Sequence, residues 1–130
     1  MDPAPRPRRV KRRRLSRSAE FDRVYRRGRS RGNRYLVLHA FPRGGNEGSR
    51  LGLSVGRKVG GAVERNRVKR VLREAFWRRA DELPEDQDYV IVARAEAREL
   101  IEREGMEGAS RALGELLATT GEMAPEDEAP

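Results

Sequence analysis

The spacing of apolar residues predicts a first helix followed by two strands. Leu15–Arg27 has a helical pattern, and Ser18 is a candidate N-cap because its hydroxyl can accept a hydrogen bond from an exposed backbone N–H. Arg34–Phe41 alternates as a strand does, with apolar groups on both faces, so we expect both faces to be partly covered. Between them, Gly28–Gly32 fits a turn or a very short strand, and Arg50–Val55 is predicted to return as a second strand.

The segment Leu51–Arg79 is predicted to form a short strand, a glycine-rich turn and a long helix with two different sides. At about 100° per residue, one arc of the helix is apolar and can pack against a sheet: Val68, Val71, Leu72, Ala75 and Phe76. The adjoining arc carries cations and one amide, with Trp77 near its far edge: Arg65, Asn66, Lys69, Arg70 and Arg73. Such a concentration of cations repels itself unless an anion lies alongside, and RNA or DNA phosphate is the obvious candidate.

The C-terminal half continues with one strand and two helices. Glu82–Asp86 contains a proline and is predicted to end the long helix. Asp88–Ala93 is almost continuously apolar and β-branched, so it should lie inside the sheet with both faces covered. Ala95–Glu104 is predicted to be a short charged helix stopped by the next glycine. Glu107–Thr119 is predicted to be a last amphipathic helix, with these residues facing inward: Ala109, Leu113, Leu116 and Leu117.

Charge is distributed very unevenly over the 130 residues, which are enough for one domain with a modest core. Residues 1–79 hold 25 Lys and Arg against 6 Asp and Glu, whereas residues 80–130 hold 4 against 15. We therefore expect a nucleic-acid-facing basic half and a solvated acidic portion. Residues 1–14 are predicted to be a disordered basic arm, residues 15–119 the domain, and residues 120–130 an acidic disordered tail. The arm is either a solubilising tail or a segment that orders on nucleic acid.

Several classes of chemistry have no support in the sequence. There is no cysteine, which excludes disulfides and thiolate metal sites. No apolar run is long enough for a secretory signal or a membrane span, so we expect a soluble, cytoplasmic protein. The single histidine, His39, is better explained by packing or recognition than by metal binding, and Glu64 and Glu74 by ion pairing than by acid–base catalysis. The chain does not resemble a self-sufficient enzyme.

Binding chemistry is what remains. Arginine side chains can hold phosphate through two parallel hydrogen bonds, and Asn66 can read a base edge or a ribose hydroxyl. Phe21 and Tyr25 are four residues apart on one face of the first helix. They are either core residues or a stacking platform for unpaired bases. The residues alone therefore indicate a basic α+β domain that binds nucleic acid.

The nine residues Ala62–Arg70, with the sequence AVERNRVKR, closely resemble the A-V-x-R-N-R-x-K-R signature of the bacterial ribonuclease P protein component. The match continues through Arg50–Val55 before the signature and Leu72–Phe76 after it. Downstream, Asp88–Arg94 resembles the family's last strand. Upstream, the family's pattern of L, F, V, G and R is matched by Leu15, Phe21, Val24, Gly28 and Arg34. The resemblance covers about residues 15–118.

The resemblance implies both a fold and a function. The implied fold is an α+β sandwich: a four-stranded sheet, three main helices and a left-handed βαβ crossover around the central basic helix. The implied function is that of the protein subunit of ribonuclease P, an endonuclease that removes the 5′ leader of precursor tRNA. In that family the catalytic RNA subunit performs the chemistry with Mg²⁺ bound mainly by RNA. The protein has no covalent cofactor, and we expect a 1:1 protein–RNA complex.

Site residues carried over from the family form two sets, and neither set contains a catalytic residue or a metal ligand. The catalytic RNA would be contacted by one set: Lys58, Arg65, Asn66, Arg67, Lys69, Arg70 and Arg73. The leader of precursor tRNA would lie in a cleft between the first helix and the sheet, lined by the other set: Phe21, Tyr25, Val37 and His39. His39 stands where many relatives have an aromatic residue, and Gly61 where an Asn is common.

Two other classes of function are compatible with a basic domain. A ribosomal or other structural RNA-binding protein would account for the basic arm and helix but not for the match to the A-V-x-R-N-R-x-K-R signature. An autonomous nuclease would need carboxylates or histidines clustered beside the basic face, and the sequence has no such cluster. The signature favours the ribonuclease P subunit over both.

Overall fold

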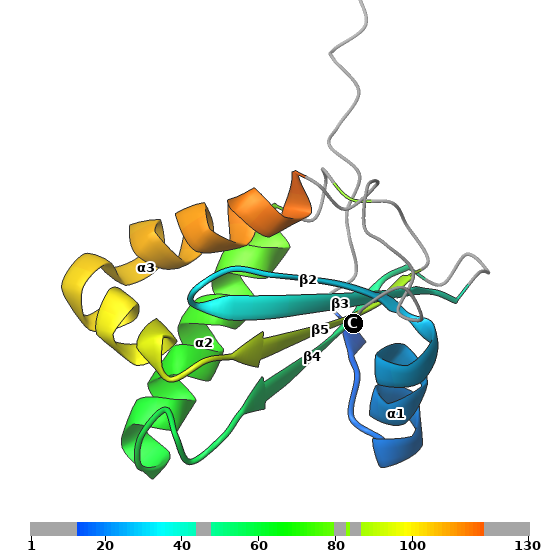
Figure 1. The fold of residues 1–130 in the computed structure, drawn as a ribbon, viewed down its shortest axis with the longest axis horizontal. Coiled ribbons are helices and arrows are strands. Elements are labelled where there is room, and N and C mark those ends of the chain that lie inside the picture. The colour runs from blue at the N-terminus through cyan, green and yellow to red at the C-terminus, as the bar shows by residue number, and fades with distance from the viewer. Residues whose placement is uncertain (1–12, 44–47, 80–82, 84–86, 119–130) are drawn as a thin grey trace, which may run out of the picture.

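The computed structural model describes residues 13–43, 48–79, 83 and 87–118. Within these ranges the chain forms three helices and one five-stranded mixed sheet (Figure 1). The elements in chain order are β1 (Arg13–Arg14), α1 (Ser18–Arg27), β2 (Arg29–Gly32), β3 (Leu36–Pro42), β4 (Arg50–Val55), α2 (Ala62–Arg78), β5 (Gln87–Ala93) and α3 (Glu96–Leu117). The predicted α+β class with three main helices is thus confirmed.

The strands lie in the order β1-β4-β5-β3-β2, with β5 at the centre of the sheet. β4 pairs with β5 in parallel, so α2 is the crossover helix between two adjacent parallel strands. β5 pairs antiparallel with β3, and β3 pairs antiparallel with β2. The central place of β5 explains why its sequence is almost continuously apolar. The left hand that the resemblance implies for the crossover stays a prediction.

The sheet has five strands rather than the predicted four. One short strand, β2, falls within the segment for which a turn or short strand was expected. The additional strand is β1, in which Arg13 and Arg14 pair in parallel with Arg50 and Leu51 of β4. These two arginines were assigned to the disordered arm because their side chains have nothing to bury. Strand pairing at a sheet edge uses backbone groups, so a side-chain pattern does not reveal it. The rest of the arm and the acidic tail lie outside the described residues.

Two apolar clusters lie on opposite faces of the sheet. The larger cluster packs α2 and α3 against one face, around contacts of Phe76 with Trp77 and Tyr89 at ring-centroid distances of 5.0 and 5.2 Å. The smaller cluster holds α1 on the other face through buried Leu15, Val24 and Val90. Trp77, which the helical pattern placed at the edge of the basic arc, is therefore buried in the core.

The first turns of α1 and α2 each contain a glutamate whose side chain folds back onto the start of the helix. The Glu20 carboxylate accepts a hydrogen bond from the backbone N–H of Arg17 at 3.3 Å, and Glu64 accepts one from Gly61 at 3.0 Å. Each glutamate satisfies a donor that the helix itself leaves unpaired. Ser18 is the first helical residue and not the N-cap, so that prediction was wrong.

The two predicted C-terminal helices are the two halves of α3. Gly105 interrupts the helix with a φ of +59°, a left-handed conformation that glycine adopts without a steric penalty. The break expected after Glu104 is therefore present, and the chain resumes its helix immediately afterwards. The four residues predicted to face inward from the second half are all buried: Ala109, Leu113, Leu116 and Leu117.

Asn33 joins the turn between β2 and β3 to α3. Its side-chain oxygen accepts hydrogen bonds from the backbone N–H groups of Tyr35 and Leu36 at 3.0 and 2.9 Å. Its amide nitrogen donates to the carbonyl oxygen of Ala112 at 2.9 Å and to Glu115 at 3.3 Å. One side chain thus shapes the turn and fastens it to a helix far away in the sequence.

Candidate nucleic-acid interface

On the face of the sheet that carries α1, the side chains lie in three rows. The first row contains charged residues, and the second and third contain glycine and serine. Side chains alternate along each strand, so the pairing register places residues from neighbouring strands side by side. The first row joins Arg50, Asp88 and Phe41; the second joins Gly52, Val90, His39 and Ser30; the third joins Ser54, Val92, Val37 and Gly32. Small residues lie at the ends of the second and third rows: Gly52, Ser30, Ser54 and Gly32.

Ion pairs in the first row fasten α1 to the sheet. Arg50 holds the fully buried Asp88 through two parallel hydrogen bonds of 2.8 Å, and Arg43 also pairs with Asp88. Arg50 extends to Glu20 on α1 as well. Burial alone would raise the pKa of Glu20, but hydrogen bonds from the Arg17 backbone and from Arg50 outweigh burial and lower it. Hydrogen bonding to Asp88 in turn raises the pKa of Arg50, so Glu20 and Arg50 are held in their charged forms.

Gly52 in the second row makes room for the ring of Phe21. A Cβ atom on Gly52 would lie 2.5 Å from Phe21 Cζ, closer than carbon atoms pack, and would make a tight 3.2 Å contact with the Cβ of Leu15. The absence of a side chain therefore lets α1 approach the sheet closely. It also fixes the height at which the Phe21 ring lies above β4.

Three of the four predicted leader-binding residues form one chain of ring contacts. Phe21 and Tyr25 have centroids 6.3 Å apart, and Tyr25 meets His39 edge to face at 4.9 Å. All three are half-buried, and Phe21 and Tyr25 pack against the small cluster around Val24. Val37 is half-buried in the adjoining third row. Phe21 and Tyr25 thus belong to the core on one side and still expose part of their surface, which is the geometry a stacking platform needs.

The predicted catalytic-RNA set lies on α2 and the turn before it. Most of its members are exposed: Lys58, Asn66, Arg67, Arg70 and Arg73; Arg65 and Lys69 are half-buried. Arg67 is rotated about 60° beyond Arg70 around the helix, so it lies at the edge of the basic arc. No ion pair between described residues involves a member of this set. The guanidinium Nε of Arg65 is shielded from solvent and has no hydrogen-bond partner within the described chain.

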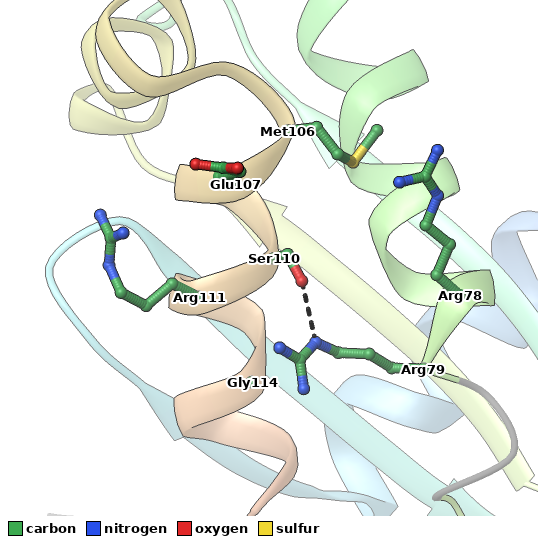
Figure 2. Close-up of a pocket in the computed structure, with 7 residues that line it drawn as sticks. All are labelled: Arg78, Arg79, Met106, Glu107, Ser110, Arg111 and Gly114. Carbon is green, nitrogen blue, oxygen red and sulfur yellow. Dashed lines mark hydrogen bonds between the residues drawn. The ribbon is translucent and has the colours of Figure 1, made fainter.

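A cavity of about 440 Å³ lies at the C-terminal end of α2 (Figure 2). Its arginines, unlike those of the basic arc, have partners among the described residues of the protein. It lies between the end of α2 and the second half of α3, where Arg79 Nε donates to Ser110 Oγ at 3.1 Å. Arg111 pairs with Glu104, and Arg78 lies 3.7 Å from Glu74. Since these arginines face carboxylates or a hydroxyl, we interpret this cavity as a joint between the helices and not as an anion site.

The groups that position α1 do not stand out in the sequence. There they are only members of strands or of the family's motif: Gly52, Arg50 and Asp88. A glycine inside a strand signals a close approach by another group, and this could have indicated the place of Phe21. The link from Glu20 to Arg50 spans 30 positions of sequence and left no local signal.

Comparison with known proteins resolves which family has this combination of fold and basic helix. A family model described as Ribonuclease P matches residues 10–117. The chain belongs to the Ribonuclease P family. The signature on α2 and the rows beneath α1 are accordingly features of a Ribonuclease P family member, and the recognition made from the sequence is confirmed.

Individual relatives agree with the family assignment. The chain is 46% identical over 90 residues to the ribonuclease P protein component of Shouchella clausii, covering 69% of this chain and 74% of the relative. It is 41% identical over 90 residues to that of Bacillus pumilus, covering 69% and 76%. Among solved structures, the RNase P protein of Staphylococcus aureus has a TM-score of 0.72 at 30% identity, covering 83% of this chain and 94% of that one. The Thermotoga maritima protein also has 0.72, at 35% identity, covering 82% and 96%.

None of the described helices is long and apolar enough to cross a membrane. In the same part of the chain, no group of three or more His, Cys, Asp or Glu side chains is arranged as metal ligands would be. Two carboxylates on the face that carries α1, Glu20 and Asp88, are paired with arginines.

Proposed function

We propose that this chain is the protein subunit of ribonuclease P, binding the catalytic RNA and the 5′ leader of precursor tRNA while the RNA performs endonucleolytic cleavage. The observation that carries the proposal is the family match, which spans residues 10–117 and includes the whole of α1, α2 and the sheet. In this proposal the protein acts in the cytoplasm as a 1:1 complex with the RNA subunit and contributes no active site of its own.

The basic arc of α2 is the proposed contact with the catalytic RNA. Lys58 and the six α2 residues from Arg65 to Arg73 named above would meet its phosphates and riboses. This is supported by the exposure of most of these groups and by the lack of carboxylate partners for them among the described residues. An RNA backbone would relieve their mutual repulsion and release counterions, so binding should weaken steeply as salt is raised.

The face beneath α1 is the proposed leader site. Unpaired leader bases would contact the exposed parts of Phe21, Tyr25 and His39, with Val37 beside them in the third row of the sheet. Support comes from the continuous ring contacts and from the half-buried state of all four residues. Stacking tolerates any base because every base has a π-face, so this site would read the presence of a leader more than its sequence.

Mg²⁺ is assigned mainly to the RNA subunit in this proposal, and no covalently attached cofactor is invoked. Glu20 and Asp88, two carboxylates on the face that carries α1, would lose their arginine partners if they moved to hold a cation. The protein's own part is to bind and orient the two RNAs, so its effect should appear in substrate affinity and in the Mg²⁺ requirement.

The leader assignment is tested by replacing Phe21 with leucine, which keeps apolar packing in the cluster but removes the aromatic face. The holoenzyme with Phe21→Leu should bind leader-bearing precursor tRNA more weakly by about 1–3 kcal/mol, or roughly 5- to 150-fold, for one lost base stack. Its affinity for mature tRNA should not change. Equal losses for both RNAs would refute the leader site at this residue.

The α2 assignment is tested by replacing Arg65 or Arg70 with alanine and measuring the affinity for catalytic RNA over a range of salt concentrations. Each lost phosphate contact should make the log–log slope shallower by about 0.7–0.9. An unchanged slope would mean that the replaced arginine does not contact phosphate. Tight RNA binding by the wild-type chain without any effect on cleavage would instead favour a structural RNA-binding protein.

A further inference from the structure

Two adjoining pockets form a groove along the β1 edge of the sheet, between α1 and α2. The first, of about 140 Å³, lies between Phe21 and the side chains of Lys69 and Arg73. The second, of about 260 Å³, continues toward Trp77 near the end of α2. Arg14 and Arg73 line both pockets, so the two form one continuous surface, here called the edge groove.

The charge of the edge groove has a single sign. Among the described residues, its ionisable lining groups are Arg13, Arg14, Lys69 and Arg73, and none is a carboxylate. Arg14 and Arg73 are exposed, and neither takes part in an ion pair between described residues. This separates the edge groove from the cavity in Figure 2, where the arginines face carboxylates or a hydroxyl. Arg14, Lys69 and Arg73 gathered around a narrow space repel one another unless an anion joins them.

Apolar side chains in the edge groove restrict which kind of anion can fit it. Phe21 and Leu53 border the first pocket, and Trp77 and Leu51 border the second. A ligand that combines regularly spaced negative charges with flat or apolar parts would match both the cations and these walls. The sugar–phosphate backbone of a nucleic acid has this chemistry, and arginine is the side chain best suited to grip its phosphates.

The position of β1 is what creates the edge groove. Arg13 and Arg14 are brought to the sheet by backbone pairing with Arg50 and Leu51, and not by apolar packing of their own side chains. The following residue, Leu15, donates its backbone N–H to the carbonyl of Leu51 at 2.9 Å and is buried beneath α1. Arg14 is thus held between a paired strand and a buried anchor, close to the basic arc of α2.

We propose that the edge groove binds the phosphodiester backbone of an RNA strand, with Arg14 and Arg73 as its main phosphate contacts. The proposal rests on the proposed function, because it connects the Phe21 end of the leader face to the Lys69 and Arg73 part of the α2 face. The strand belongs either to the leader of precursor tRNA or to the catalytic RNA, and the two sources share the chemistry that the groove recognises.

The test uses the full chain with Arg14→Ala, Arg14→Lys and the control Arg78→Ala. Arg78 is an exposed arginine of α2 that lines neither pocket, so its replacement removes the same charge elsewhere. Two affinities are measured between 50 and 200 mM salt: that of the protein for catalytic RNA, and that of the holoenzyme for precursor against mature tRNA. Circular dichroism melting verifies that the variants fold.

For one of the two RNAs, Arg14→Ala should make the slope of log affinity against log salt shallower by about 0.7–0.9. The loss of affinity relative to the wild-type chain should therefore be about threefold smaller at the high end of this salt range than at the low end. Arg14→Lys should keep the slope because it keeps the charge, and Arg78→Ala should leave both slopes unchanged. A shallower slope for catalytic RNA identifies that RNA as the source, and one confined to precursor tRNA identifies the leader. Slopes for Arg14→Ala that equal those of Arg78→Ala in both assays overturn the proposal.

Failure of the edge groove and failure of the proposed function can be told apart. If the wild-type chain does not distinguish precursor from mature tRNA, the leader function fails. The slope for catalytic RNA still decides whether Arg14 contacts phosphate. If the wild-type chain does make that distinction while Arg14→Ala changes neither slope, only the edge groove is wrong.

Discussion

Replacing Gly52 with alanine should disturb leader binding through a residue that need not touch RNA. The new Cβ would lie 2.5 Å from Phe21 Cζ and 2.9 Å from its neighbouring ring carbon. Carbon atoms pack at about 3.5–4.0 Å, so the ring has to withdraw by about 1 Å or α1 has to rise from the sheet. Overpacking of this kind costs about 1–3 kcal/mol, which corresponds to a melting temperature lower by about 4–12 °C in a domain of this size.

The functional consequence of Gly52→Ala is a displaced stacking surface. The holoenzyme should lose part of its preference for precursor over mature tRNA, up to the roughly 5- to 150-fold expected for one complete base stack. Urea unfolding measures the stability, and equilibrium binding of the two RNAs measures the preference. Gly52→Ala removes no cation from α2, so the salt slope of the affinity for catalytic RNA should not change.

Gly56→Ala is the matched control, because a Cβ at Gly56 has open space around it within 4 Å. The double variant Gly52→Ala with Phe21→Leu should recover stability relative to Gly52→Ala alone, since leucine vacates the space that the ring tip occupied. Leader preference should stay low in that double variant. If Gly52→Ala unfolds and binds leader as Gly56→Ala does, the close packing of Phe21 on β4 is not what positions the ring.

Two further predictions concern the groups that hold the fold. Asn33→Ala should lower the free energy of unfolding by about 1–3 kcal/mol in urea titrations, because it removes the bond to Ala112 and leaves backbone donors of the turn unpaired; an unchanged midpoint would contradict this. Glu20→Gln should cost about 1 kcal/mol at neutral pH by removing the charge facing Arg50. The folded-state pKa of Glu20 is lowered. The difference in free energy of unfolding between the wild-type chain and Glu20→Gln should therefore be complete above the ordinary pKa of about 4.3 and should vanish as the pH falls through the folded-state pKa. A difference that grows below about pH 4 would contradict the assigned pairing.

Elements with a repeating apolar pattern could be predicted from the sequence, and those made by backbone pairing or distant side chains could not. The alternation in β3 and the apolar run in β5 indicated their places because burial acts on side chains at regular intervals. The interruption of α3 at Gly105 was expected because glycine ends helices. The pairing of β1 was missed because it depends on backbone groups of two charged residues. The buried position of Trp77 depends on how α2 meets the rest of the fold, which helical spacing alone does not contain.

In the candidate site, too, some features could be predicted from the sequence and others could not. The exposed cations of α2 could be identified because a helix has a fixed angular repeat, and because the signature named them. The ring contacts of Phe21 and Tyr25 could be suggested but not decided, since core and stacking roles require the same spacing. Their half-buried state depends on Gly52 and on the ion pairs of Arg50 with Asp88 and Glu20, which bring together residues 30 and 38 positions apart.

The most direct test of the central claim is cleavage of a precursor tRNA at low Mg²⁺ by a bacterial ribonuclease P RNA, with and without this chain. The account predicts that the protein restores cleavage at the mature 5′ end and that the protein without RNA cleaves nothing. Tight binding to the RNA with no restored cleavage would contradict a role as the subunit of ribonuclease P. Cleavage by the protein alone would contradict the assignment of the chemistry to RNA.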